Sequence, residues 1–162
     1  MVQKICYVEI VRKQKQFRFE VDQSIRIEET NKDSIVALAN DEQSFTVKIP
    51  RRAKRQIFET FRRKGSPKQF APSVFAVAII LIINKSKLKP QDLVIDIEYP
   101  GYETEIMQCI SEAFPKLKIY FTEIGKKSPA HYAAYGVYIK KRKANALCSS
   151  EEILRQIKKY KK

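Results

Sequence analysis

Residues 92–143 read DLVIDIEYPGYETEIMQCISEAFPKLKIYFTEIGKKSPAHYAAYGVYIKKRK, and this stretch decides the fold. Residues 93–97 form a short apolar run rich in β-branched residues, which predicts a buried strand that ends at the sequence YPG. Residues 102–113 have helical spacing, and residues 118–124 form a second apolar strand. This order predicts two parallel strands joined by a helix.

The next segment predicts another helix directly after the second strand. Ser128 is a good capping residue, and Pro129 suits the first helical position. The small apolar residues of this helix, which would let it approach a sheet closely, are Ala130, Ala133, Ala134 and Val137. The basic cluster Lys140 to Lys143 ends the helix favourably for its dipole. Ser149 or Ser150 can cap a last helix.

The first 50 residues predict a meander of short antiparallel strands, because apolar residues alternate between turn-rich breaks. The expected strands are Ile5 to Val11, the run Phe17, Phe19, Val21, the run Ile25, Ile27, and the run Phe45, Val47, Ile49, with Ile35 to Ala39 as an additional candidate. After Pro50 the period becomes helical, so residues 51–64 predict a basic helix. The uninterrupted apolar run 74–83 favours a buried helix, with a strand as the alternative.

A chain of 162 residues, 44% of them hydrophobic, fits one domain with a sizeable core. We expect a single domain over residues 1–162. Its parts are the meander (1–50), the basic and buried helices (51–91), the strand-helix-strand-helix core (92–146) and a basic C-terminal helix (147–162). The fold class is therefore α/β, with an N-terminal antiparallel meander followed by parallel strands and flanking helices.

The net charge of +14 is segregated along the chain. Residues 51–91 carry 11 basic and 1 acidic side chain, residues 92–124 carry 2 and 7, and residues 125–162 carry 11 and 2. Basic surface of this size attracts polyanions, and nucleic acid is the commonest polyanion in the cytoplasm. The alternatives are a charge that only promotes solubility, or a surface for an acidic protein partner.

Cys6, Cys109 and Cys148 are isolated, which argues against a disulfide framework and against a structural zinc site. The amino terminus lacks an apolar signal core, and the run 74–83 is too short to cross a bilayer. We therefore expect a soluble cytoplasmic protein that does not act on membranes. Its oligomeric state is left open.

Asp96 interrupts the strand of residues 93–97, and Glu98 lies on the same face because side chains alternate along a strand. Two carboxylates near the carboxyl end of a core strand are a plausible start for a Mg²⁺ or Mn²⁺ site. The alternative is that Asp96 caps the adjoining turn or pairs with a lysine. The chain has no P-loop, dinucleotide fingerprint or GxSxG motif.

The order of elements resembles the ribonuclease H-like superfamily, in which a three-stranded meander precedes a helix, a central parallel strand, a helix, a strand and a final helix. In that superfamily, acidic residues on the first strand, first helix, central strand and last helix converge on divalent metals, and some members use histidine in the last role. The resemblance implies a nuclease with catalytic residues Glu9, Glu59, Asp96 and His131. The candidate metal ligands are Glu9 and Asp96 from this set, together with Glu98 from the strand alternation described above. Glu59 could instead pair with Arg55 or Arg63, and His131 could be structural.

Candidate nucleic-acid contacts are the basic residues of the two positive blocks. Lys126 and Lys127 precede a helix amino terminus, where free amides favour an anion. The full set is Arg51, Arg52, Arg55, Arg62, Arg63, Lys126, Lys127, Lys140, Lys141, Arg142 and Lys143. Tyr132, Tyr135 and Tyr138 are interleaved with this basic sequence and could stack on bases or pack internally. The two functions left open are a metal-dependent nuclease and a non-catalytic binding or assembly module; the sequence does not distinguish DNA from RNA.

Overall fold

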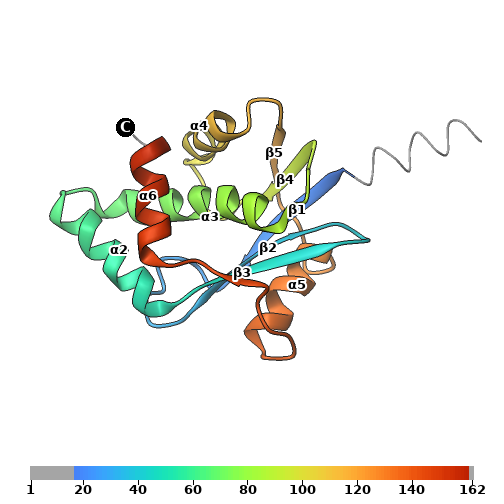
Figure 1. Ribbon diagram of the computed structural model, residues 1–162, viewed down its shortest axis with the longest axis horizontal. Coiled ribbons are helices and arrows are strands. Elements are labelled where there is room, and N and C mark those ends of the chain that lie inside the picture. Colours follow the sequence, from blue (N-terminus) through green and yellow to red (C-terminus); the bar gives the residue numbers. More distant parts are fainter. Residues whose placement is uncertain (1–16, 161–162) are drawn as a thin grey trace, which may run out of the picture.

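The structure is a computed structural model that describes residues 17–160. These residues form five α-helices and a six-stranded mixed sheet (Figure 1). The strands lie side by side in the order β5-β4-β1-β2-β3-β6. The strands are β1 (Arg18–Ser24), β2 (Ser34–Ala39), β3 (Ser44–Ile49), β4 (Asp92–Asp96), β5 (Lys118–Thr122) and β6 (Ala146–Leu147). The helices are α2 (Arg51–Arg63), α3 (Phe70–Ser86), α4 (Glu103–Ala113), α5 (Pro129–Tyr138) and α6 (Ser150–Tyr160), with a 3₁₀ turn at Pro67–Gln69.

The sheet combines an antiparallel meander with parallel strands. β1, β2 and β3 pair antiparallel in sequence order, whereas β4 joins β1 in parallel and β5 joins β4 in parallel. The expected crossover from β4 through α4 to β5 is therefore confirmed. The register between β1 and β4 pairs Val21 with Ile95, so the next residues along both strands reach the same edge of the sheet.

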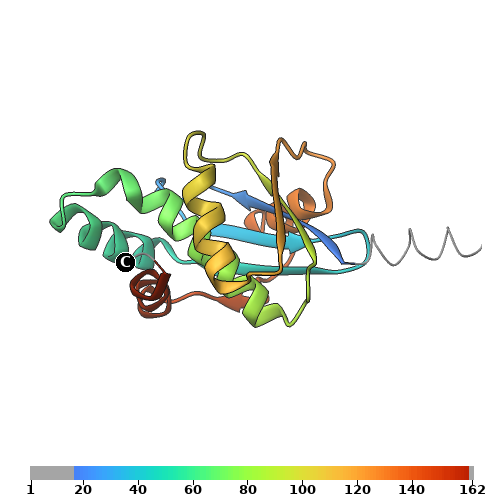
Figure 2. The same cartoon turned by 90° about the horizontal axis from the view of Figure 1, so that it is seen from above.

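The two faces of the sheet are covered unequally. α3 packs on one face, and α4 and α6 pack against α3, whereas α5 lies alone on the other face among the described helices (Figure 1). The perpendicular view shows α4 crossing over α3 (Figure 2). Phe19, Val21, Leu93 and Ile95 point into the core with α3, and Ile35, Ala37 and Ala39 pack against α5.

The apolar run 74–83 lies within α3, so the helix interpretation is confirmed and the strand alternative is wrong. With the preceding turn, the helical segment Pro67–Ser86 has 20 residues, longer than the apolar run suggested. Its length and composition would suffice to cross a membrane. However, 72% of its most apolar window is buried inside the domain, as in the core helix of a soluble protein.

Two expectations for the meander need correction. The pair Ile25 and Ile27 does not form a strand, because it lies in the β1–β2 connection, where Ile25 has a left-handed φ of 64°. Ile27 is nevertheless fully buried, so its apolar character reflects packing of the connection. The segment from Ile35 to Ala39, expected only as an additional strand, belongs to β2, which lies between β1 and β3 in the sheet. The strand expected at Ile5 to Val11 lies outside the described residues.

Candidate metal centre

Asp22, Asp96 and Glu98 form a cluster of carboxylates at the carboxyl ends of β1 and β4. One carboxylate oxygen from each lies within 4.8 Å of the others. Asp22 follows the core residue Val21, as Asp96 follows the core residue Ile95, so the parallel pairing of β1 with β4 brings the two aspartates together. Glu98 lies two residues after Asp96, as the alternation of the strand predicts.

His131, in the first turn of α5, brings a ring nitrogen to this cluster. Ser128 caps α5 by accepting a hydrogen bond from the backbone amide of His131 at 3.0 Å, as expected. This cap fixes the first turn, and the His131 Nδ1 lies 3.1 Å from the Asp22 Oδ2. The helix start at Ser128 therefore brings His131 to the end of β1.

Other hydrogen bonds hold the two aspartates in place. The backbone amide of Gln23 donates to the Asp22 Oδ1 at 2.8 Å, and the amide of Ile124 donates to the Asp96 Oδ1 at 2.8 Å. The latter bond ties β4 to the loop after β5. Burial and the nearby Asp96 charge raise the pKa of Asp22, although the Gln23 amide opposes this.

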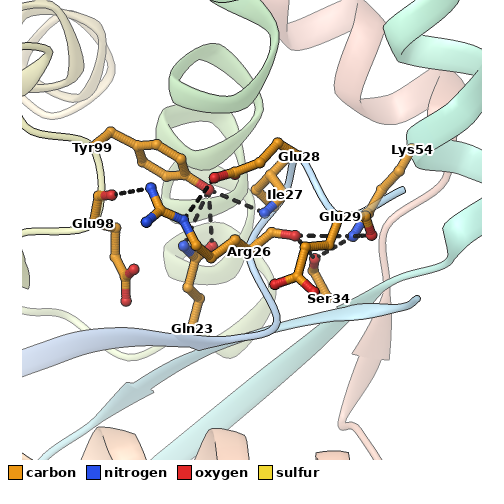
Figure 3. Close-up of polar contacts among 9 residues, drawn as sticks. All are labelled: Gln23, Arg26, Ile27, Glu28, Glu29, Ser34, Lys54, Glu98 and Tyr99. Carbon is orange, nitrogen blue, oxygen red and sulfur yellow. Dashed lines mark hydrogen bonds and ion pairs between the residues drawn. The ribbon is translucent and has the colours of Figure 1, made fainter. Parts of the chain in front are cut away.

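The position of Glu98 is set by the β1–β2 connection (Figure 3). Arg26 donates to the Glu98 backbone oxygen at 2.6 Å, and its guanidinium lies 5.1 Å from the centre of the Tyr99 ring. The Tyr99 hydroxyl accepts from the Ile27 amide and from the Gln23 side chain, each at 3.1 Å. These contacts join the residues after β4 to the end of β1.

Glu98 is the carboxylate whose ionisation is most perturbed. Burial, together with the neighbouring Asp96 and Asp22 charges, raises its pKa to about 8. At neutral pH the metal-free cluster therefore holds a proton on Glu98, because three charged carboxylates this close repel one another. A divalent cation would remove that repulsion and would compete with this proton.

This raised pKa predicts how stability depends on pH. The unfolded chain loses the Glu98 proton near the ordinary value of 4.5, but the fold keeps it to about 8. The folded state then binds more protons, so the Glu98 contribution to stability decreases as pH rises from 4.5 to 8. Glu98→Gln should remove this decrease, and its stability relative to wild type should increase with pH in urea unfolding without metal. A difference that stays constant over this range would contradict the assignment.

The donor set fits a hard divalent cation. Carboxylate oxygens are the ligands that hard cations prefer in proteins. Glu20 lies two residues before Asp22 on the same face of β1, and its Oε2 is buried without a hydrogen-bond partner among the described residues.

The structure places the remaining predicted site residues elsewhere. Glu59 does not join the cluster: its carboxylate pairs with Arg62 at 2.9 Å and lies 3.9 Å from Arg63, and this pairing lowers its pKa. This arrangement is the surface ion pair considered as the alternative. Glu9 lies outside the described residues. Lys126 and Lys127 are exposed on the loop between β5 and α5, and Arg51, Arg52 and Arg55 are exposed on α2.

Sequence reasoning missed Asp22. A signal was available, because Asp22 directly follows the alternating run Phe19, Val21 at the end of a strand, just as Asp96 follows Ile95. The alternating run predicts only a strand, and the superfamily resemblance points to Glu9 for the first-strand position.

No protein-family model, curated protein or solved structure matches the chain.

Proposed function

We propose that this protein is a divalent-metal-dependent nuclease that hydrolyses phosphodiester bonds in nucleic acid. The observation that carries the proposal is the convergence of Asp22, Asp96 and Glu98 within 4.8 Å, with His131 bound to Asp22. Phosphodiester hydrolysis needs hard cations held by several carboxylate oxygens near a surface that binds phosphates. The cluster supplies the first requirement, and Lys126 and Lys127 on the adjoining loop supply the second.

The arrangement supports a ribonuclease H-like architecture. An antiparallel meander is followed by parallel strands β4 and β5, and the last of these leads into α5 on the opposite face. Acidic side chains on the first and central strands of the sheet and a histidine on the helix after β5 are the pattern that the superfamily resemblance implies. Asp22 lies on the first described strand and takes the first-strand position of this pattern. Glu98 supplies the carboxylate that Glu59 does not.

The residues can be given roles in this reaction. Asp22, Asp96 and Glu98 would hold Mg²⁺ or Mn²⁺, which when bound would polarise the phosphate and stabilise its developing charge. His131 orients Asp22 through its Nδ1 and is partly exposed, so it is placed to exchange a proton with substrate or solvent. Lys126 and Lys127 would position the phosphate backbone without reading its sequence.

A non-catalytic nucleic-acid-binding module is the second candidate. The hydrogen bonds from Gln23, Ile124 and His131 provide Asp22 and Asp96 with partners without any cation. The cluster could therefore serve only to join β1, β4 and α5. Cys109 and Cys148 are buried and do not form a disulfide with another described residue, which supports a reducing cytoplasmic setting for either function.

The test is incubation of labelled single- and double-stranded DNA and RNA with the protein in Mn²⁺ or Mg²⁺, with EDTA as the control. We expect cleavage that requires the metal and a rise in melting temperature on adding Mn²⁺. Binding of nucleic acid without cleavage, by a protein whose melting temperature is indifferent to Mn²⁺, would favour the binding module.

A further inference from the structure

The outer face of α5 carries exposed aromatic side chains. Tyr132, Tyr135 and Tyr138 are 61%, 45% and 41% exposed, and Ile139, which follows the helix, is 36% exposed. The opposite face of α5 already packs against the sheet through its alanines and Val137. Within residues 17–160 the tyrosines are not packed internally, and a contiguous exposed stripe of this kind is typical of a binding surface.

The stripe extends from the acidic cluster along the helix. His131, which contacts Asp22, is stacked on Tyr135 with the ring centres 5.9 Å apart and the planes 9° from parallel. The ring centres of Tyr135 and Tyr138 lie 6.3 Å apart, so these two rings are also close neighbours. Residues three apart rise about 4.5 Å along a helix, a spacing that successive unpaired bases can match.

Basic side chains lie at both ends of the stripe. Lys126 and Lys127 precede α5, and the segment from Lys140 to Lys143 follows it, all of them exposed. The amides of Lys141 and Arg142 donate to the Gly136 oxygen, and the Arg142 side chain lies over Gly136, so the basic segment folds back along the helix. None of these cations forms an ion pair with another residue of the 17–160 range.

The far end of the stripe opens into a cationic cleft of about 500 Å³. Its lining includes Tyr138, the basic residues Lys32, Lys48, Arg51 and Lys140, and the single carboxylate of Asp33. Asp33 accepts a hydrogen bond from the Arg51 backbone amide, which occupies one of its oxygens. Four cations around one tyrosine favour an anionic ligand with a flat apolar part.

We infer that the outer face of α5 binds single-stranded nucleic acid, with unpaired bases stacked on Tyr132, Tyr135 and Tyr138 and phosphates held by the flanking lysines and arginines. Only unpaired bases can offer their faces to side chains, because the bases of a duplex are stacked on one another. A second copy of the chain would place the same basic side chains against each other, and their positive charges would repel. The charge of this surface therefore favours a polyanion over a second copy. The idea that this surface leads substrate to the acidic cluster rests on the proposed function. The inference that the surface binds single strands does not depend on it.

The test is fluorescence anisotropy in EDTA with three short labelled probes: a single strand, the same strand with abasic sites, and a duplex. Wild type should bind the normal strand more tightly than the abasic strand. The triple variant Tyr132→Ala/Tyr135→Ala/Tyr138→Ala should bind the normal strand about tenfold or more weakly than wild type does. Its affinity for the abasic strand should change little. The corresponding triple Tyr→Phe variant should keep the preference, and Tyr120→Ala, which removes a 51% exposed tyrosine from β5, is the matched control.

Lys126→Ala/Lys127→Ala should weaken binding of normal and abasic strands alike, because phosphates are common to both. Equal binding of the normal strand by wild type and the triple alanine variant would overturn the inference, as would a wild type that prefers the duplex. A dimer that dissociates in the alanine variant without any change in nucleic-acid affinity would assign the surface to a second copy instead. Tyrosine-dependent binding without metal-dependent cleavage would retain this inference and reject the nuclease.

Discussion

Asp96→Asn should abolish Mn²⁺-dependent cleavage and the Mn²⁺-induced rise in melting temperature, while stabilising the metal-free protein. The variant removes a charge from a cluster whose three carboxylates lie within 4.8 Å. Its side-chain oxygen can still accept the hydrogen bond from Ile124, so the strand end keeps its connection to the next loop. We expect a gain of about 1 kcal/mol without metal and a loss of cleavage of at least about 100-fold.

Melting temperatures and cleavage rates of wild type and variant, with and without Mn²⁺, measure both effects. Asp92→Asn is the matched control, because it removes the same charge at the opposite end of β4 and should preserve the response to metal. A destabilised Asp96→Asn beside a wild type indifferent to Mn²⁺ would mean that Asp96 is structural. That outcome would reject the nuclease and leave the binding module.

Lys54→Ala should cause a large loss of stability. Lys54 is fully buried, and its Nζ donates to the backbone oxygens of Arg26 at 3.2 Å and Glu29 at 2.7 Å and to the Ser34 hydroxyl at 2.7 Å (Figure 3). Burial lowers the pKa of Lys54 to about 8, and the three acceptors hold its side chain in place. Alanine would remove three hydrogen bonds from a buried site and leave a cavity there, at a cost of about 3 kcal/mol or more.

Urea unfolding measures this loss, with Arg52→Ala as the matched control, because Arg52 is an exposed cation on the same helix. The loss should extend to the candidate metal centre, since Lys54 anchors the connection from which Arg26 contacts the Glu98 backbone. Lys54→Ala should therefore also weaken the thermal response to Mn²⁺. A variant as stable as Arg52→Ala would show that the connection holds its shape without Lys54.

Local signals in the sequence predicted most helices and the parallel core correctly. The Ser128–Pro129 start of α5, the helical spacing of α2 and α4, and the apolar strands β4 and β5 depend on interactions within a few residues. The face shared by Asp96 and Glu98 follows from strand alternation alone. The same local patterns misplaced Ile25 and Ile27, because alternation cannot distinguish a strand from a connection whose apolar residue is buried.

Central burial also obscured β2. All six of its residues are buried because helices cover both faces of the sheet, so its sequence does not alternate as an exposed meander strand would. From the sequence, Glu59 is expected to pair with a nearby arginine, whereas for Asp96 a metal site and a structural partner are equally plausible. Only the fold places Arg62 beside Glu59 and Asp22 beside Asp96.

The sequence by itself determined the kinds of elements, the segregated charge and one pair of carboxylates on a strand. The tertiary structure decided which distant residues complete the cluster, because the parallel pairing of β1 with β4 brings Asp22 beside Asp96, and α5 brings His131 to Asp22 from 109 residues further along the chain. The tertiary structure also decided that the tyrosines of α5 face outward, because the alanine face of this helix packs against the sheet. Register and layer packing arise from contacts over the whole domain, and such contacts leave no local pattern in the sequence.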